Sequence, residues 1–291
     1  MPTFVRAADG RRLAVKLSGD PAGVPVVLLH GTPGSRLGPL PRARKLYAMG
    51  VRLISFDRPG YGRSDRLPER RVADVAADVA AIADELGLDS FSVLGRSGGG
   101  PHALACAALL PDRVRRAGAL VSLAPFQAEG LDWFAGMADS NVGSYTDAAS
   151  APELLTARLV RAAARIAADP GSHLAELDRE MPEADRRVVR EAGLRELLAK
   201  NFAEALRYSA DGWIDDALAF CSPWGFDPAD VSAPVLLWHG ADDVHSPVSH
   251  TRWLADRIPT ATVTIRPGVA HFGAFAVVPE VLAWLVSPSR S

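Results

Sequence analysis

The stretch FSVLGRSGGGPHAL, Phe91–Leu104, marks the point where a predicted strand becomes a predicted helix. Apolar residues run into G-R-S-G-G, and an alanine- and leucine-rich helical pattern follows. A serine hydroxyl needs an exposed position, a base and a charge stabiliser before it becomes a useful nucleophile. A sharp strand–turn–helix corner exposes the hydroxyl and requires small residues two positions before and after it, here Gly95 and Gly99. The stretch therefore predicts Ser97 as a nucleophile; a glycine-rich turn that only reverses the chain is the alternative.

Short apolar runs typical of buried parallel strands recur on both sides of this stretch. They are Val24–Leu29, Val51–Phe56, Phe91–Leu94, Ala117–Leu123, Val235–Trp238 and Thr262–Ile265, with a weakly alternating outer strand at Arg12–Leu17. Helical patterns lie between them at Ala73–Leu86, Pro101–Leu110, Val248–Arg257 and Pro279–Val286. Strands that alternate with helices through short connections predict an α/β fold with a doubly wound, mostly parallel sheet.

The interval from residue 127 to residue 223 follows a different pattern. It is rich in Ala, Leu, Arg and Glu, and its helical stretches are Glu153–Ala168, Asp185–Leu198 and Phe202–Ser209. We therefore expect a discontinuous core domain, residues 1–126 and 224–291, interrupted by an all-helical cap, residues 127–223. The charges of the cap are mixed in sign, as is typical of solvated helix faces.

Composition narrows the classes of partner. The 291 residues carry a net charge of -2 and have a pI near 6.4, so nothing favours nucleic acid or an anionic membrane as a partner. No segment reaches the ~20 apolar residues that span a bilayer, and the N-terminus lacks the apolar run of a signal peptide. We expect a cytoplasmic protein, a monomer or homodimer, that binds a small-molecule substrate. Cys106 and Cys221 are expected to be free thiols.

A second motif, LLHGTPGS at Leu28–Ser35, directly follows an apolar strand. An acyl-transfer intermediate carries an oxyanion that two backbone N–H groups must meet. Gly98, just after the serine, can supply one of them. Because Pro33 has no N–H, the second donor is assigned to the backbone of Thr32. A purely structural turn is the alternative for this loop.

Two motifs near the C-terminus supply a candidate acid and a candidate base. LLWHGADDVHSP contains Asp242 and Asp243 after a predicted strand, and only one of two neighbouring side chains can point into a site. GVAHFGAF places His271 in a loop after the last strand, where a carboxylate can orient it. The other histidines are expected elsewhere: His30 at a turn, His102 in the core, and His245 and His250 beside a helix that packs outside.

In this order the motifs HGTPG, FDRPGYGRSD, GRSGGG, HGADDVHSP and GVAHFG resemble the α/β-hydrolase family. The resemblance covers nearly all of the chain except the helical insertion, which corresponds to the family's variable cap. It implies a triad of Ser97, His271 and an aspartate. In similar sequences the acid follows H-G-x-x-D-x-x-x-P, which selects Asp243 and leaves Asp242 in reserve. Arg96 stands where relatives frequently carry His. It either pairs with an acidic group, shapes the floor of the site, or points away.

A serine nucleophile excludes some of the reactions that members of this family catalyse. Haloalkane dehalogenases and epoxide hydrolases resemble this chain in scaffold but use an aspartate, so Ser97 argues against both. We expect a serine hydrolase that cleaves a small, largely apolar ester or lactone through an acyl-enzyme, without metal or organic cofactor. The alternatives are an aminopeptidase of the proline-iminopeptidase type, a carbon–carbon bond hydrolase, a cofactor-free perhydrolase, and a non-catalytic small-ligand receptor.

Apolar residues near the predicted site are candidates for the substrate pocket. Those with the best positions are Leu37, Phe126, Trp133 and Phe272. An aminopeptidase would instead need cap carboxylates that hold the substrate amine, for which Glu153, Glu176 and Glu204 are available.

Overall fold

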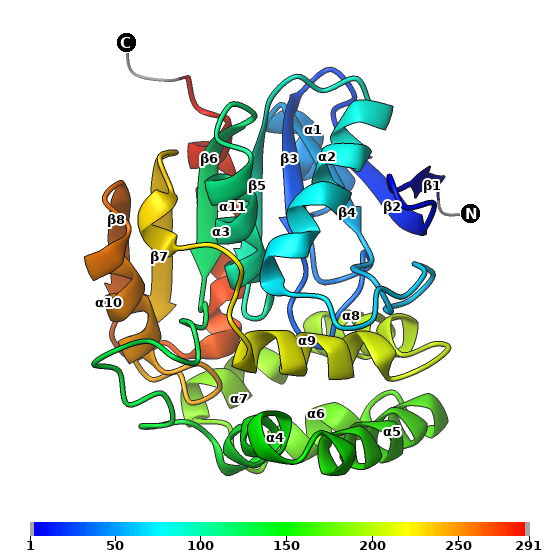
Figure 1. Ribbon diagram of the computed structural model, residues 1–291, viewed down its shortest axis with the longest axis vertical. Helices are drawn as coiled ribbons and strands as arrows, with labels where there is room; N and C mark the ends of the chain where they lie inside the picture. Colours follow the sequence, from blue (N-terminus) through cyan, green and yellow to red (C-terminus); the bar gives the residue numbers. More distant parts are fainter. Residues whose placement is uncertain (1–2, 289–291) are drawn as a thin grey trace.

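The computed structural model describes residues 3–288, which form an eight-stranded sheet with helices on both faces (Figure 1). The strand order is β1-β2-β4-β3-β5-β6-β7-β8, and every pair from β4 to β8 is parallel, whereas β1 and β2 run antiparallel to their neighbours. The strands are β1 Thr3–Arg6, β2 Arg12–Gly19, β3 Val24–Leu29, β4 Val51–Phe56, β5 Phe91–Arg96, β6 Val114–Leu120, β7 Val235–Gly240 and β8 Ala261–Arg266. This confirms the predicted α/β class and the mostly parallel sheet.

The central strands are apolar on both faces because helices cover both faces. Val27 of β3 pairs with Ile54 of β4 on one side and with Val93 of β5 on the other. Successive side chains point to opposite faces. Val27 therefore joins one buried cluster, while its neighbour Val26 joins another.

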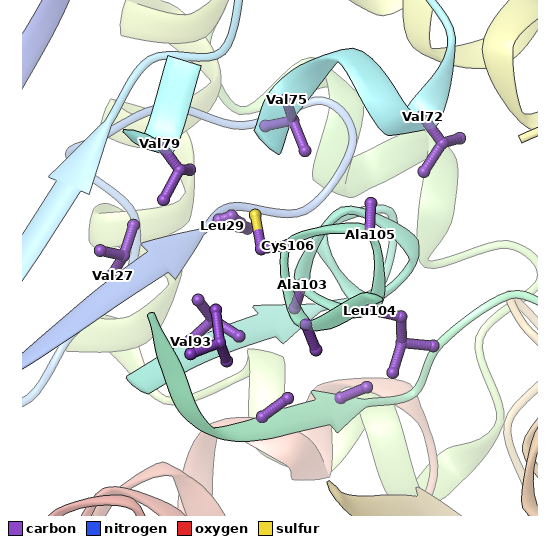
Figure 2. Close-up of a cluster of buried hydrophobic side chains, with 14 of the residues drawn as sticks. Val27, Leu29, Val72, Val75, Val79, Val93, Ala103, Leu104, Ala105 and Cys106 are labelled. Carbon is purple, nitrogen blue, oxygen red and sulfur yellow. The ribbon is translucent and has the colours of Figure 1, made fainter. Parts of the chain in front are cut away.

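Helices α2 Val75–Glu85, α3 Gly99–Leu109 and α10 Val248–Arg257 cover the face that Val27 joins. Figure 2 shows α3 pressed against the sheet there, with Ala103 and Cys106 close to Leu29 and Val93. Small side chains on α3 allow this close approach. Helices α1 Ala43–Ala48 and α11 Ala274–Val286 pack on the opposite face. Within residues 3–288 no helix combines the length and the apolar character needed to cross a membrane.

Six helices lie between β6 and β7, beyond the ends of the parallel strands (Figure 1). They are α4 Asp139–Ser150, α5 Pro152–Ala168, α6 Ser172–Leu177, α7 Glu183–Val189, α8 Ala192–Ala205 and α9 Asp211–Cys221. These helices share a buried cluster that contains Leu159 and Phe202 and also includes Tyr61 and Phe272 from outside the insertion. Helices α8 and α9 lie on the side of the insertion toward the sheet, whereas α4, α5 and α6 lie farther from it.

Several predicted bounds are corrected. The expected strand Ala117–Leu123 is Val114–Leu120, because Val121 has a φ of 45° and the chain leaves the sheet there. The expected helix Asp185–Leu198 is interrupted after Val189, and residues 202–205 complete α8. Helix α4 escaped prediction because Gly143, Asn141 and three serine residues give it low helix propensity.

Candidate active site

Ser97 lies at the corner between β5 and α3 with a φ of 55°, in the left-handed region that few residues other than glycine adopt. Its N–H donates to the carbonyl of Leu120 at 2.8 Å. A Cβ at Gly95 would lie 2.1 Å from the carbonyl oxygen of Gly99, and a Cβ at Gly99 would lie 2.1 Å from that of Leu29. The corner therefore has no room for side chains on either side of the serine, as the spacing predicts.

His271 follows β8 and meets the loop after β7. Its Nδ1 lies 2.8 Å from Oδ2 of Asp243, so Nδ1 donates to the carboxylate and Nε2 is left as the basic nitrogen. The other oxygen of Asp243 accepts the backbone N–H groups of His245 and Ser246 at 2.8 and 3.0 Å. Burial opposes the charge, yet His271 and His239 hold the pKa of Asp243 well below its usual range. Asp242 is exposed, so the buried carboxylate is Asp243.

A cavity of about 140 Å³ joins these elements beneath the helices of the insertion. Ser97 and His271 both line it, and Thr32 and Gly98 lie on the same wall. An engineered apolar cavity of similar volume holds a benzene molecule, so the space suits a small substrate. The aromatic part of its lining is Tyr145, Phe202, Trp213, Phe272 and Phe275.

Thr32 and Gly98 are in direct contact, since a Cβ at Gly98 would lie 2.2 Å from Thr32 Oγ1. Among the hydrogen bonds of the described chain, none uses the backbone N–H of either residue. Two free donors on the wall beside Ser97 are the feature that an oxyanion site needs.

Sequence reasoning missed the residue that holds this loop. Thr32 Oγ1 donates to Oδ2 of Asp216, on α9, at 2.5 Å. The same buried carboxylate is the common acceptor for Arg58, Tyr61, Arg70 and His102. Burial opposes its charge, but Arg58 and Arg70 hold the pKa of Asp216 well below its usual range. In the sequence, Asp215 and Asp216 are two adjacent acidic residues, and nothing distinguishes them from the charged residues of a solvent-exposed helix face.

The structure corrects the position of one histidine. His245, expected beside an outer helix, is buried and lines the cavity, with its ring centroid 5.3 Å from that of His271. His30 contacts the carbonyl of Gly31 through Nδ1 at 2.8 Å, so it lies at a turn as expected. His102 is fully buried in the core, also as expected.

The expected pocket lining is corrected as well. Phe272 lines the cavity, but Leu37, Phe126 and Trp133 do not. Trp133 is buried, donates from Nε1 to the carbonyl of Ala124 at 2.9 Å, and packs edge-on against Phe126. After leaving the sheet, the chain folds these rings into the core cluster instead of the cavity wall.

Arg96 is among the residues that line the cavity. Its guanidinium carbon lies 3.9 Å from the ring centroid of Phe275 and 5.7 Å from that of Phe272. The guanidinium therefore forms part of the wall next to Ser97.

Comparison with known proteins gives one family description. A family model for the alpha/beta hydrolase fold matches residues 24–275. A solved alpha/beta hydrolase fold protein from Nakamurella multipartita aligns with 98% of this chain and 99% of its own, with a TM-score of 0.68 and 26% identity.

Curated relatives match a shorter part of the chain. The proline iminopeptidase of Neisseria gonorrhoeae is 36% identical over 116 residues, which are 38% of this chain and 37% of the relative. Epoxide hydrolase B of Mycobacterium tuberculosis is 34% identical over 115 residues, 38% of this chain and 32% of the relative. The matches span about a third of these relatives' length, and the relatives differ in activity.

Proposed function

The chain belongs to the α/β-hydrolase fold family, and from that premise we propose that it is a serine hydrolase of a small ester or lactone. The observation that carries the proposal is the 2.8 Å contact between His271 and Asp243, with His271 lining the same cavity as Ser97. A base oriented by a carboxylate, in the same cavity as a serine at a strained corner, is the arrangement that can activate a hydroxyl.

In the proposed reaction Ser97 Oγ attacks the substrate carbonyl carbon while His271 Nε2 takes the hydroxyl proton. Asp243 stabilises the resulting imidazolium, and the N–H groups of Thr32 and Gly98 stabilise the oxyanion. Collapse of the tetrahedral intermediate expels the alcohol, which leaves with the proton from His271. Water then attacks the acyl-enzyme, gives a proton to His271, and releases the acid; the proton returns to Ser97.

The cavity wall favours an ester or lactone over a peptide with a free amino terminus. An aminopeptidase must hold an ammonium group, which needs a carboxylate in the site. Glu153 is exposed, Glu176 pairs with Arg165, and Glu204 pairs with Arg36. Among the described residues that line the cavity, none is Asp or Glu. The serine at position 97 likewise argues against epoxide hydrolysis through an aspartyl ester.

Hydrolysis of short p-nitrophenyl esters tests the proposal. Wild type should release p-nitrophenolate, and Ser97→Ala and His271→Ala should each lower kcat by roughly 10³-fold or more. A wild-type protein inert toward every ester, lactone and amide offered would refute the hydrolase. Turnover by the variants equal to that of wild type would refute the assignment of the site.

A further inference from the structure

Three side chains on the cavity wall each have a buried nitrogen without a hydrogen-bond partner among the described residues. These atoms are Arg96 Nη1, His173 Nδ1 and His245 Nε2. Buried polar groups are normally hydrogen-bonded, so three unpaired nitrogens in one cavity require an explanation. They come from the end of β5, from α6 and from the loop after β7, so no single local distortion accounts for them.

Two of the three groups lie near the same ring. The ring centroid of Phe272 is 5.7 Å from the guanidinium carbon of Arg96 and 6.0 Å from the centroid of the His245 ring. His173 belongs to α6 and lines the same cavity. His245 is also next to His271, so the group lies beside the proposed base.

Arg96 gives this wall a positive charge without a salt-bridge partner among the described residues, although Asp185 and Asp243 oppose the lowering of its pKa by burial. Burial lowers the pKa of Arg96 to about 10, which leaves the guanidinium charged at neutral pH. Within residues 3–288 no carboxylate oxygen lies within salt-bridge distance of it, and the described lining has no acidic residue. Burial likewise lowers the pKa of His245 to about 4, so this ring is neutral and has an N–H to donate.

Two carboxylates lie near the wall without lining it. Asp243 is committed to His271. Asp185 of α7 accepts the backbone N–H of Phe272 at 2.7 Å through Oδ1, while its Oδ2 is buried and unpartnered. Burial raises the pKa of Asp185, while His271, the backbone N–H of Phe272 and Arg96 act in the opposite direction.

We propose that Arg96, His173 and His245 form a subsite for a carboxylate of the substrate, so that the enzyme acts on a small ester or lactone bearing a free acid group. A carboxylate has two acceptor oxygens, which can accept from a guanidinium and from a neutral imidazole N–H. The proposal rests on the proposed hydrolase function and names its substrate class. The largely apolar remainder of the wall would hold the hydrocarbon between the carboxylate and the scissile carbonyl.

The alternative is that Arg96 only packs on Phe275. In that case its replacement would change stability, or would slow charged and neutral substrates equally. The test therefore compares the kcat/KM values of one enzyme for two substrates, and does not rely on its activity toward a single substrate. Methyl hydrogen glutarate and methyl 5-oxohexanoate have the same number of heavy atoms and the same methyl ester, and differ by a carboxylate oxygen in place of a methyl group.

Methanol release measures the hydrolysis of both esters. Wild type should have a kcat/KM for methyl hydrogen glutarate that is roughly 10- to 100-fold higher than its kcat/KM for methyl 5-oxohexanoate. Arg96→Gln should abolish this preference, and Arg96→Lys should retain part of it. His173→Phe, which keeps a ring against Phe202 and Trp213, should reduce it several-fold. The matched control is Arg187→Gln, which removes one positive charge from an exposed position of α7 and should leave the ratio unchanged. Absence of a preference in wild type, or its persistence in Arg96→Gln, would overturn the subsite.

A binding measurement separates failure of the subsite from failure of the hydrolase. By calorimetry, Ser97→Ala should bind methyl hydrogen glutarate more tightly than methyl 5-oxohexanoate, and Ser97→Ala/Arg96→Gln should bind the two alike. Selective binding by a protein inert toward both esters would keep the subsite and reject the hydrolase. Equal hydrolysis and equal binding of the two esters would keep the hydrolase and reject the subsite.

Discussion

Oδ2 of Asp243 lies 2.8 Å from Nδ1 of His271, although the two residues belong to loops after different strands. Neighbouring parallel strands end at the same edge of a sheet, so β7 and β8 bring their following loops together there. The carboxylate accepts two backbone N–H groups at its other oxygen, which holds it in place for His271. The contact leaves Nε2 of His271 as the basic nitrogen.

Asp243→Asn should lower kcat by about 10³- to 10⁴-fold, because an amide cannot stabilise the imidazolium and favours the wrong tautomer. The neighbouring substitution Asp242→Asn is the control, since that side chain is exposed and should tolerate the change. Steady-state ester hydrolysis measures both. If Asp242→Asn were the more damaging of the two, the assignment of the acid would be wrong.

Ser97→Gly should be more stable than Ser97→Ala by roughly 0.5–1 kcal/mol in the free energy of unfolding. Position 97 has a φ of 55°, which glycine adopts without the Cβ clash that alanine suffers. Urea denaturation of the two inactive variants measures the difference. A less stable glycine variant would show that the corner stores no backbone strain.

Asp216→Asn should lower the free energy of unfolding by about 3–5 kcal/mol, because it leaves buried Arg58 and Arg70 without their common anion. It should also lower kcat, since Thr32 loses the acceptor that holds its loop. Asp215→Asn is a matched control on the same helix. Its partner Arg66 is 41% exposed, so the loss should be about 1 kcal/mol or less. Equal losses in urea denaturation would contradict the role given to Asp216.

Lowering the pH from 7 to 5 should destabilise the fold. Burial lowers the pKa of His250 to about 4, against about 6.5 in the unfolded chain. Between these values the unfolded chain binds the extra proton, so stability falls as the pH falls, by up to about 1.4 kcal/mol per pH unit for each such group. His102 has a pKa lowered to about 4 by the same cause and contributes with the same sign.

His250→Gln should reduce this pH dependence. Nδ1 of His250 accepts the N–H of Ala124, and Nε2 contacts the carbonyl of Trp133, so protonation would remove an acceptor. Urea denaturation at pH 7, 6 and 5 measures the slope for wild type and variant. A slope that stays the same or becomes steeper in the variant would contradict the buried neutral state of His250.

Local sequence patterns were sufficient for most of the sheet. Val24–Leu29 and Val51–Phe56 were predicted with their observed bounds, because strands buried on both faces read as continuous apolar runs. The strand Val114–Leu120 was displaced in the prediction because Arg115 and Arg116 interrupt its apolar pattern. Short motifs likewise singled out Ser97 and His271, which the structure brings to one cavity.

Residues whose role depends on contacts distant in sequence were not predictable. Asp216 meets Thr32 across 184 positions, and neither segment suggests the other. His245 was expected beside a helix that packs outside, because the loop after β7 gives no local sign of its direction. Trp133 and Phe126 were expected in the pocket because aromatic residues suit both a pocket and a core. Only the packed structure distinguishes these cases.

Labelling with a fluorophosphonate, followed by intact-protein and peptide mass spectrometry, tests the central claim most directly, because only an activated serine reacts rapidly. Wild type should take up one equivalent on Ser97, His271→Ala should react far more slowly, and Ser97→Ala should not react. An unmodified wild type, or an adduct that persists in Ser97→Ala, would contradict the assignment of Ser97 as the nucleophile.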